Sequence, residues 1–423
     1  MNFLVFTDDW GRHPSSCQHL MRFFLREERF GHNVIIWMNT IGTRPPRLDM
    51  LTLKRGFEKL FHWAKWKKNR STKEEKDELC PVIYNPLMYP WFRQRVDRKI
   101  NRFFLQHAVR KALRHVSGPV TAITTLPIVA DLVGATFQDS PISRWVYYCV
   151  DDWSQWPGAD AATMEKMEKE LLPKVDCVIC AGVALQERLK TLGRESSLLT
   201  HGVDIEHWHF EQSVKESALD AFQNLPEDSR LAEFFQDIPR PFFTFWGLID
   251  ERLDLEMVRR LADDVVSGTL IFAGPSASQR VISELKHPKI RLVGKLAYRE
   301  LPLLARCSDV LIMPYRNIPV TQQMQPLKMT EYLASGRPAV VRRLPACEAW
   351  ADALDMIETP EDFSLLVRLR VESGLPECQR AARERLKDES WEAKAAEFER
   401  MMGGRESGGG EMMEPDGRNK PQA

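Results

Sequence analysis

The amino-acid sequence predicts an α/β protein made of two doubly wound domains, each built on a parallel sheet. Short apolar runs alternate with amphipathic stretches long enough for crossover helices, and this series occurs twice along the chain. The two series are separated by an acidic stretch, residues 211–239, which carries no strand signal and is predicted to be a linker with one or two helices. At 423 residues, the chain also has the length of two domains.

The first series predicts an N-terminal domain over residues 1–210. Its strand candidates are the apolar runs 2–7, 33–39, 82–85, 120–125, 145–150 and 176–181. Between them, stretches such as 15–30 gather apolar side chains on one face, and Ser15 or Ser16 can cap that helix.

The second series predicts a C-terminal domain over residues 240–388. Its strand candidates are 241–247, 269–274, 290–294, 310–314, 339–342 and 356–358. Residues 389–402 are predicted to form a terminal helix, because apolar residues recur at helical spacing from Trp391 to Met402. Residues 403–423 are rich in Gly, Pro, Glu and Met and are expected to be disordered. Two such domains leave a cleft between the carboxyl ends of their strands, where ligands bind.

The composition excludes several classes of protein. A hydrophobic content of 43% and a charged content of 28% are typical of globular proteins. No apolar run approaches the roughly 20 residues of a membrane-spanning helix, and the opening run 2–7 is too short for a signal peptide. The eight cysteines lack framework spacing, and Cys177 and Cys180 lie in an apolar strand rather than at a redox or zinc turn. A reducing, cytoplasmic location is therefore expected.

The charge is distributed unevenly. Residues 1–150 hold 24 Lys and Arg against 13 Asp and Glu, a net charge of about +11, and the remainder balances it. Within this part, residues 51–79 interleave seven basic residues between Lys54 and Arg70 with aromatic and aliphatic ones at helical spacing. This pattern is typical of an interfacial helix on an anionic membrane surface, and a helix docked on its own domain remains an alternative.

The most informative segment, residues 325–341, reads QPLKMTEYLASGRPAVV. It predicts a loop, a helix that opens near Pro326, a glycine just past the helix end at Gly336, and a strand. Such a helix opening presents unpaired N–H groups that suit a phosphate, and Lys328 adds a full charge. Glu331, about one turn later, can accept hydrogen bonds from two ribose hydroxyls. By itself, a capped helix before a strand occurs in any α/β protein.

In its length and order this segment resembles the nucleotide-sugar motif of family-4 (group 1) retaining glycosyltransferases, which have the GT-B architecture of two Rossmann-like domains facing across a cleft. The resemblance implies that Gln325, Pro326, Leu327, Lys328 and Glu331 bind the donor. It places Glu331 at the second glutamate of the family's E-x7-E motif. The first falls on Gln323, a candidate catalytic position where a glutamine can hydrogen-bond a hydroxyl but cannot act as a base.

Other segments resemble the family in the same order. His201, Gly202 and Asp204 lie in a sequence similar to its N-G-V-D junction between domains. Residues 247–254 are similar to its phosphate-contacting turn, with Leu248 at the usual arginine. Gly247 and Gly274 would allow the backbone to approach the nucleotide, and Arg252 would share the diphosphate with Lys328.

In the N-terminal domain two loops after strands provide further candidates. Gly11 and Arg12 follow the first strand and are predicted to face the donor. Asp151 and Asp152 follow the strand 145–150, where many family members carry an acceptor-side His or Asp, so both are candidate catalytic residues; capping of the next helix is the alternative. The sequence holds no D-x-D, the metal-chelating motif of the GT-A class, which favours a site without metal.

The sequence therefore predicts a glycosyltransferase that moves a sugar from a nucleotide-diphosphate sugar to a lipid-linked or polysaccharide-precursor acceptor, with retention. The nucleotide sugar is a co-substrate, and no cofactor or nucleic-acid partner is expected. Peripheral association with the inner membrane face through residues 51–79 is also predicted. A catalytically weakened binding subunit and a nucleotide-sugar epimerase are alternatives. A dehydrogenase is disfavoured because no G-x-G-x-x-G follows a strand.

Overall fold

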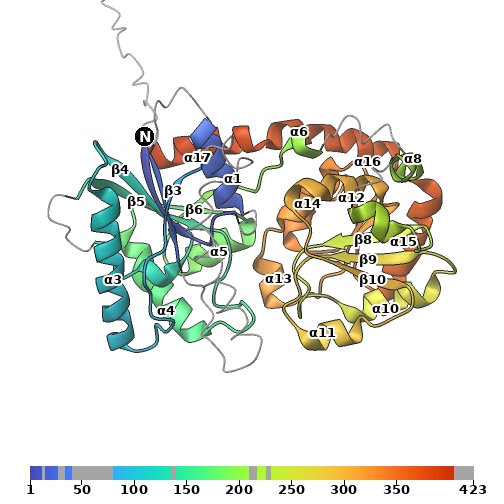
Figure 1. Ribbon diagram of the computed structural model, residues 1–423, viewed down its shortest axis with the longest axis horizontal. Helices are drawn as coiled ribbons and strands as arrows, with labels where there is room; N and C mark the ends of the chain where they lie inside the picture. The colour runs from blue at the N-terminus through green and yellow to red at the C-terminus, as the bar shows by residue number, and fades with distance from the viewer. Residues whose placement is uncertain are drawn as a thin grey trace, which may run out of the picture.

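Two lobes lie side by side, and each is a sheet flanked by helices (Figure 1). The computed structural model describes residues 1–11, 15–26, 34–40, 80–134, 140–208, 217–224 and 230–403. The predicted insertion 51–79 and all but the first residue of the predicted tail 403–423 lie outside these ranges. Two doubly wound parallel-sheet domains, the predicted fold class, are confirmed.

The described residues of the N-terminal lobe form a parallel sheet of order β3-β2-β1-β4-β5-β6-β7. Its strands are β1 (Asn2–Thr7), β2 (Ile35–Asn39), β3 (Val82–Tyr84), β4 (Val120–Thr124), β5 (Ile142–Cys149), β6 (Cys177–Cys180) and β7 (Ser197–Leu198). Its helices are α1 (Ser16–Arg26), α3 (Arg95–Leu113), α4 (Ala161–Leu171) and α5 (Val183–Thr191), with short 3₁₀ turns η3 (Pro127–Val129) and η4 (Leu172–Lys174). Every strand but the two-residue β7 overlaps a predicted run, and β5 begins three residues before its run.

The C-terminal lobe has a parallel sheet of order β10-β9-β8-β11-β12-β13. Its strands are β8 (Phe242–Trp246), β9 (Thr269–Ala273), β10 (Ile290–Gly294), β11 (Val310–Met313), β12 (Ala339–Arg342) and β13 (Asp355–Ile357). Its α-helices are α6 (Ile205–Trp208), α8 (Ala218–Gln223), α9 (Arg230–Phe235), α10 (Leu255–Asp264), α11 (Gln279–Glu284), α12 (Leu301–Cys307), α13 (Pro319–Gln323), α14 (Leu327–Ala334), α15 (Pro360–Ser373) and α16 (Glu377–Ala382). The last helix, α17 (Trp391–Gly403), packs against the N-terminal lobe. The 3₁₀ turns are η5 (Tyr298–Glu300), η6 (Pro345–Trp350) and η7 (Arg383–Glu389).

The central strands are buried on both faces because helices cover both sides of each sheet. In β8 all five residues are buried, and in β1 only the first residue is partly exposed. This explains why the strands read as continuous apolar runs rather than as alternating ones. Helices α8 and α9, which fall within the predicted linker, bury Ala221, Leu231 and Phe235 in the C-terminal core.

The chain crosses between the lobes twice. Leu199 belongs to the core of the N-terminal lobe, and Val203 already belongs to that of the C-terminal lobe. The chain returns with α17, which lies beside α1 (Figure 1) and buries Ala395 and Phe398 against the N-terminal lobe. The two crossings are joined by hydrogen bonds from Val203 N to Glu389 O (2.9 Å) and from Trp391 N to Val203 O (3.2 Å). Among the described residues, no helix has the length and apolar character needed to cross a membrane.

Candidate active site

A cavity of about 760 Å³ lies between the two lobes, within the size range of small-molecule sites. Its lining residues follow the carboxyl ends of strands in both sheets: Gly11 after β1, Asp151 after β5, Gly247 after β8, Gly274 after β9 and Lys295 after β10. This is the crevice in which doubly wound sheets bind their ligands. The predicted cleft is therefore present.

Two cations lie together on the C-terminal side of this cavity. Lys328 is in the first turn of α14, and its Nζ donates to Tyr315 Oη and lies 4.8 Å from the centre of the Tyr315 ring. The Arg252 guanidinium lies 5.8 Å from the same ring. Helix α14 begins at Leu327, so Pro326 is its N-cap rather than its first residue. The Pro326 side chain has no acceptor atom and cannot cap the first N–H groups of the helix. The structure thus brings both predicted phosphate ligands to a helix N-terminus that faces the cavity.

Arg252 also reaches across the cleft. Its Nε donates to Asp250 Oδ1 at 2.9 Å within the same turn. Its guanidinium lies 4.9 Å above the ring of Trp156, which belongs to the N-terminal lobe. The side chain is 8% exposed, so its charge acts in a largely water-excluded environment, where electrostatic interactions are stronger.

Glu331 lines the cavity one turn along α14 from Lys328. Burial raises the pKa of its carboxyl group to about 7, and the hydrogen bond from Trp246 and the charge of Lys328 oppose that rise. Trp246 Nε1 donates to Glu331 Oε2 at 2.8 Å, and the Trp246 ring stacks on Trp208 at 5.5 Å. The orientation of Glu331 is therefore set by an indole that is itself fixed by packing.

Gly247 and Gly274 form a tight pair of turns beside this helix. At Gly247 (φ +136°) a Cβ would lie 2.2 Å from Lys328 Nζ, and at Gly274 (φ +144°) it would lie 1.9 Å from the Gly247 carbonyl oxygen. Both glycines were predicted to allow approach of the nucleotide. In the structure each one is also required by the packing of the protein itself, since a side chain would displace Lys328 or separate the turns.

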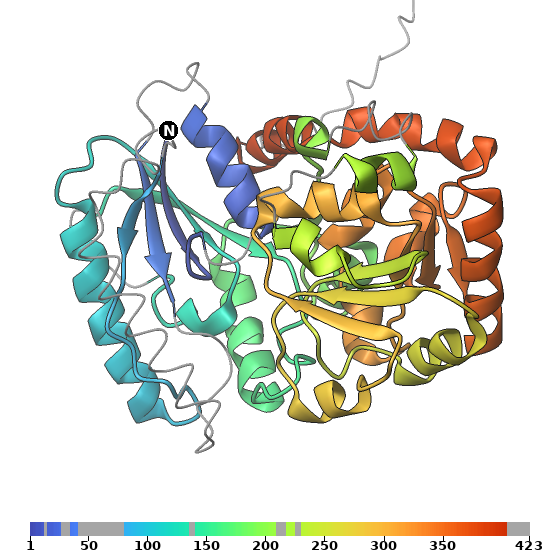
Figure 2. The same cartoon turned by 45° about the vertical axis from the view of Figure 1, so that its right-hand side comes forward.

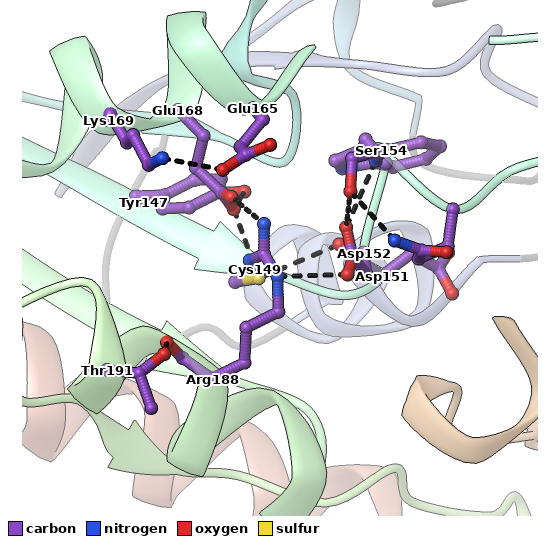
Figure 3. A network of polar contacts seen from close by, with 12 residues as sticks. Tyr147, Cys149, Asp151, Asp152, Ser154, Glu165, Glu168, Lys169, Arg188 and Thr191 are labelled. Atoms are coloured by element: carbon purple, nitrogen blue, oxygen red, sulfur yellow. Dashed lines mark hydrogen bonds and ion pairs between the residues drawn. The ribbon is translucent and has the colours of Figure 1, made fainter. Parts of the chain in front are cut away.

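The neighbouring carboxyls Asp151 and Asp152 point in different directions. Asp151 lines the cavity, and burial raises its pKa to about 7 although the Arg252 charge opposes the rise. Asp152 lies outside the cavity lining and pairs with Arg188 Nε at 2.9 Å (Figure 3). Ser154 Oγ also donates to Asp152 Oδ1 at 2.6 Å, and Arg188 binds Glu168 in turn. Asp152 therefore lies outside the cavity in an ion pair, and the catalytic role predicted for it stays a prediction.

Gln323 lines a second cavity, of about 320 Å³, and is absent from the lining of the larger one. His201 and Gln325 line both cavities. Gly202 lies at the first crossing, where a Cβ would come within 3.0 Å of the Trp391 ring. Asp204 caps α6 by accepting from His207 N at 2.9 Å. The remaining predicted donor ligands, Pro326 and Leu327, line the larger cavity, and Arg12 lies outside the described residues.

Residues 251–367, which include Arg252, Lys328 and Glu331, match the model of the family Glycosyl transferases group 1. This part of the chain is similar to group 1 glycosyltransferases. It is also 28% identical over 189 residues to TuaH of Bacillus subtilis (strain 168), which its name assigns to teichuronic acid biosynthesis as a glycosyltransferase. That match covers 43% of this chain and 44% of TuaH, less than half the length of either protein.

Solved structures resemble the whole chain. Sucrose-phosphate synthase of Thermosynechococcus elongatus has a TM-score of 0.64 at 14% identity, covering 95% of this chain and 98% of that one. HepE of Anabaena in complex with UDP-glucose has a TM-score of 0.65 at 11% identity, covering 94% and 99%. The catalytic domain of starch synthase IV from Arabidopsis thaliana, bound to ADP and acarbose, has a TM-score of 0.63 at 11% identity, covering 95% and 98%. The fold is GT-B.

Several residues of this GT-B cavity were not predicted from the sequence. They are mainly aromatic or amide side chains that line it: Gln18, Trp156, Trp246, Tyr298 and Tyr315. Gln18 Oε1 accepts from Gly11 N at 3.0 Å and its Nε2 donates to Asp8 Oδ2 at 2.7 Å, so it fixes the first loop. The place of Trp246 in the cavity could have been predicted from the sequence, because this residue ends a strand directly before Gly247. Trp156 and Tyr298 carried none, since each enters the cavity from a loop or short turn.

Proposed function

We propose that the protein transfers a glycosyl group from a nucleoside-diphosphate sugar to a saccharide or lipid-linked acceptor in polysaccharide synthesis. The observation that carries the proposal is the meeting of Lys328, Arg252 and Glu331 in one interlobe cavity at a helix N-terminus. The match of residues 251–367 to the group 1 family and the similarity to TuaH support the reaction class and the pathway type. HepE, a solved relative by fold, is a complex with UDP-glucose.

Each charged group has a role in this proposal. The diphosphate binds at the start of α14 between Lys328 and Arg252, and the ribose hydroxyls donate to Glu331. When the bond between the anomeric carbon and the distal phosphate oxygen breaks, the released diphosphate gains negative charge, which both cations and the helix N-terminus stabilise. The protein then needs no metal or other cofactor, and retention of configuration follows from the family resemblance.

Membrane association is the second part of the proposal. The basic and aromatic composition of residues 51–79 suits an anionic inner-leaflet surface on the cytoplasmic side. A lipid-linked acceptor would be presented at that surface.

The donor site is tested by calorimetry and by hydrolysis of UDP-, GDP-, ADP- and dTDP-sugars. Lys328→Ala and Arg252→Ala should each weaken binding of the best nucleoside diphosphate by about 10- to 150-fold, because each removes a charge-assisted hydrogen bond. Lys169→Ala, at an exposed lysine of α4, is the control and should change nothing. Unchanged affinity in both cavity variants would remove the diphosphate from this position.

The same assays separate the alternative functions. Binding without turnover would identify a binding subunit, and conversion of the sugar without an acceptor would identify an epimerase.

Asp151 is proposed to orient or deprotonate the acceptor hydroxyl. Asp151→Asn should lower kcat by about 10²- to 10⁴-fold with the donor Kd nearly unchanged. Asp152→Asn is the matched control, because it weakens the Arg188 ion pair outside the cavity and should lower the melting temperature more than kcat. Steady-state kinetics and thermal unfolding of both variants check this. Equal losses of activity in the two variants would contradict the assignment.

A further inference from the structure

The outer face of α3 exposes apolar side chains. Val96, Ile100 and Phe103 recur at three- and four-residue spacing and are 62%, 36% and 66% exposed. The opposite face of the same helix buries Leu105 and Val109 in the core. Helix α3 is therefore apolar on two sides, and only one of them packs against the described part of the chain.

Basic side chains surround these exposed apolar residues. The exposed cations on the helix and just past its end are Arg95, Lys99, Arg102, Arg110, Lys111 and Arg114. Between residues 95 and 114 the sequence holds a single acidic residue, Asp97, whose carboxylate accepts from Gln94 N at the helix start (3.0 Å). Arg98 is the exception among the cations. It turns toward the lobe and pairs with Asp131 at 2.6 Å and with Glu170, which holds α3 in place.

The loop before α3 adds to the same surface. Leu87, Tyr89 and Trp91 are 65%, 41% and 41% exposed, and Met88 and Phe92 beside them are buried as anchors. The backbone of this loop is fixed to α3 by the buried side chain of Asn101. Its Oδ1 accepts from Tyr89 N at 2.7 Å, and its Nδ2 donates to the carbonyl oxygens of Tyr89 (3.0 Å) and Trp91 (3.1 Å). The exposed aromatic rings are thus held at the side of α3.

This surface lies on the flank of the N-terminal lobe that faces away from the C-terminal lobe. Helix α3 is the outermost element on that side in Figure 1, and Figure 2, turned by 45°, shows the same position. A flat partner can therefore approach α3 without contacting the C-terminal lobe.

We propose that α3 and loop 87–91 form a membrane-docking face that binds anionic lipid bilayers. Aromatic and aliphatic side chains among Lys and Arg are the composition of interfacial segments, and an exposed apolar patch marks an interaction surface. The proposal deepens the membrane association proposed above by adding a second, structurally defined surface. Residues 51–79 carry nine basic and five acidic residues, so like charge disfavours that segment as the cover of this face and favours a shared anionic partner.

The test is flotation of the full chain with vesicles of phosphatidylcholine alone or with phosphatidylglycerol. One variant neutralises the cations (Lys99→Gln, Arg102→Gln, Lys111→Gln), and its control removes three charges from the other lobe (Arg259→Gln, Arg280→Gln, Lys286→Gln). Each cation near an anionic surface strengthens binding about fivefold, so the first variant should bind about a hundredfold more weakly at low salt and the control should bind like wild type. A second pair replaces exposed apolar residues: Leu87→Ser with Phe103→Ser, against Val266→Ser with Leu365→Ser as control.

The expected result is binding of wild type to the anionic vesicles only, reduced by both α3 variants and by neither control. Donor hydrolysis by all variants should equal that of wild type, because α3 is remote from the cavity. Undiminished flotation of the α3 variants, with loss on changing Lys65, Lys67 and Lys68 to Glu, would overturn the proposal and leave residues 51–79 as the membrane contact. A dimer in sedimentation that Phe103→Ser dissociates would also overturn it. Failure of donor hydrolysis in wild type would contradict the proposed function without affecting the flotation result.

Discussion

Glu331 and Asp151 face the same cavity, and burial raises the pKa of each to about 7 from ordinary values of 4.5 and 3.8. Between about pH 4 and pH 7 the folded protein therefore holds protons that the unfolded chain has released. The contribution of these two groups to the free energy of unfolding falls as the pH rises through that window. Buried carboxyl groups that destabilise the folded protein in this way are typical of a ligand site, because a bound ligand can stabilise their charged form.

The pH dependence of donor binding should report on Glu331. Ribose hydroxyls donate to the ionised carboxylate, so the affinity for a ribonucleoside diphosphate should fall up to about tenfold per pH unit below 7. Trp246→Phe removes the hydrogen bond that lowers this pKa, and should move the onset of the fall to higher pH. Calorimetry from pH 6 to 9 measures both profiles, with Glu331→Gln and a 2′,3′-dideoxy ligand as pH-insensitive controls. A wild-type profile as flat as that of Glu331→Gln would show that another group binds the ribose.

Of the residues that the sequence singled out, Lys328, Glu331 and Arg252 line the larger cavity, and Asp152 and Gln323 do not. The first three belong to a helix start and a turn, where local geometry directs side chains into the crevice. Asp151 and Asp152 are neighbours in one loop, and their separation depends on Arg188, which arrives from α5 much later in the chain. Gln323 ends α13, and a break before α14 turns it toward the second cavity. Such partners are fixed only by tertiary packing.

At the scale of elements, the turns after β8 and β9 depend on each other through Gly247 and Gly274. Gly274→Ala should lower the free energy of unfolding by about 2–4 kcal/mol, because it adds a steric clash with the Gly247 carbonyl to an unfavourable φ. Gly193→Ala is the matched control. Gly193 also has a positive φ (+81°), but nothing lies within 4 Å of its Cβ position, so about 1 kcal/mol is expected. Urea unfolding compares the two, and equal losses would show that the close contact between turns is unimportant.

The elements themselves were largely predictable, because a parallel sheet covered on both faces leaves apolar runs that local reasoning recognises. Strand β7 was missed, since two residues carry no periodicity. The helix α17 was predicted from the spacing of Trp391, Ala395 and Phe398. Its partner was not, because helical spacing identifies an apolar face without showing which surface covers it. The docking face on α3 could not be predicted for a related reason. Its exposed apolar residues have the same helical spacing in the sequence as buried core residues.

At the scale of the whole molecule, the N-terminal lobe is completed by the end of the chain. Phe398 and Ala395 are fully buried there, and Phe398 packs on Tyr148 with ring centres 5.3 Å apart. A chain that stops after Glu389 should therefore lose hydrogen-exchange protection in β1, β4 and β5 while β8 and β11 stay protected. Phe398→Ala, which removes one buried ring and costs about 3–5 kcal/mol, should weaken the same strands to a smaller extent. Equal loss of protection in both lobes would show that they unfold as one unit.

The return of α17 has a consequence for how such a protein can be recombined. The N-terminal lobe is not a continuous stretch of sequence: it consists of residues up to about Leu199 together with the helix from Trp391. A chimera that exchanges this lobe with a relative at one junction would join its sheet to a foreign helix and leave α1 and Tyr148 against side chains that never evolved with them. Two junctions are needed, one at each crossing between the lobes: the first near Val203 and the second near Glu389. Exchange of the N-terminal lobe between relatives of this architecture must therefore carry both ends of the gene together.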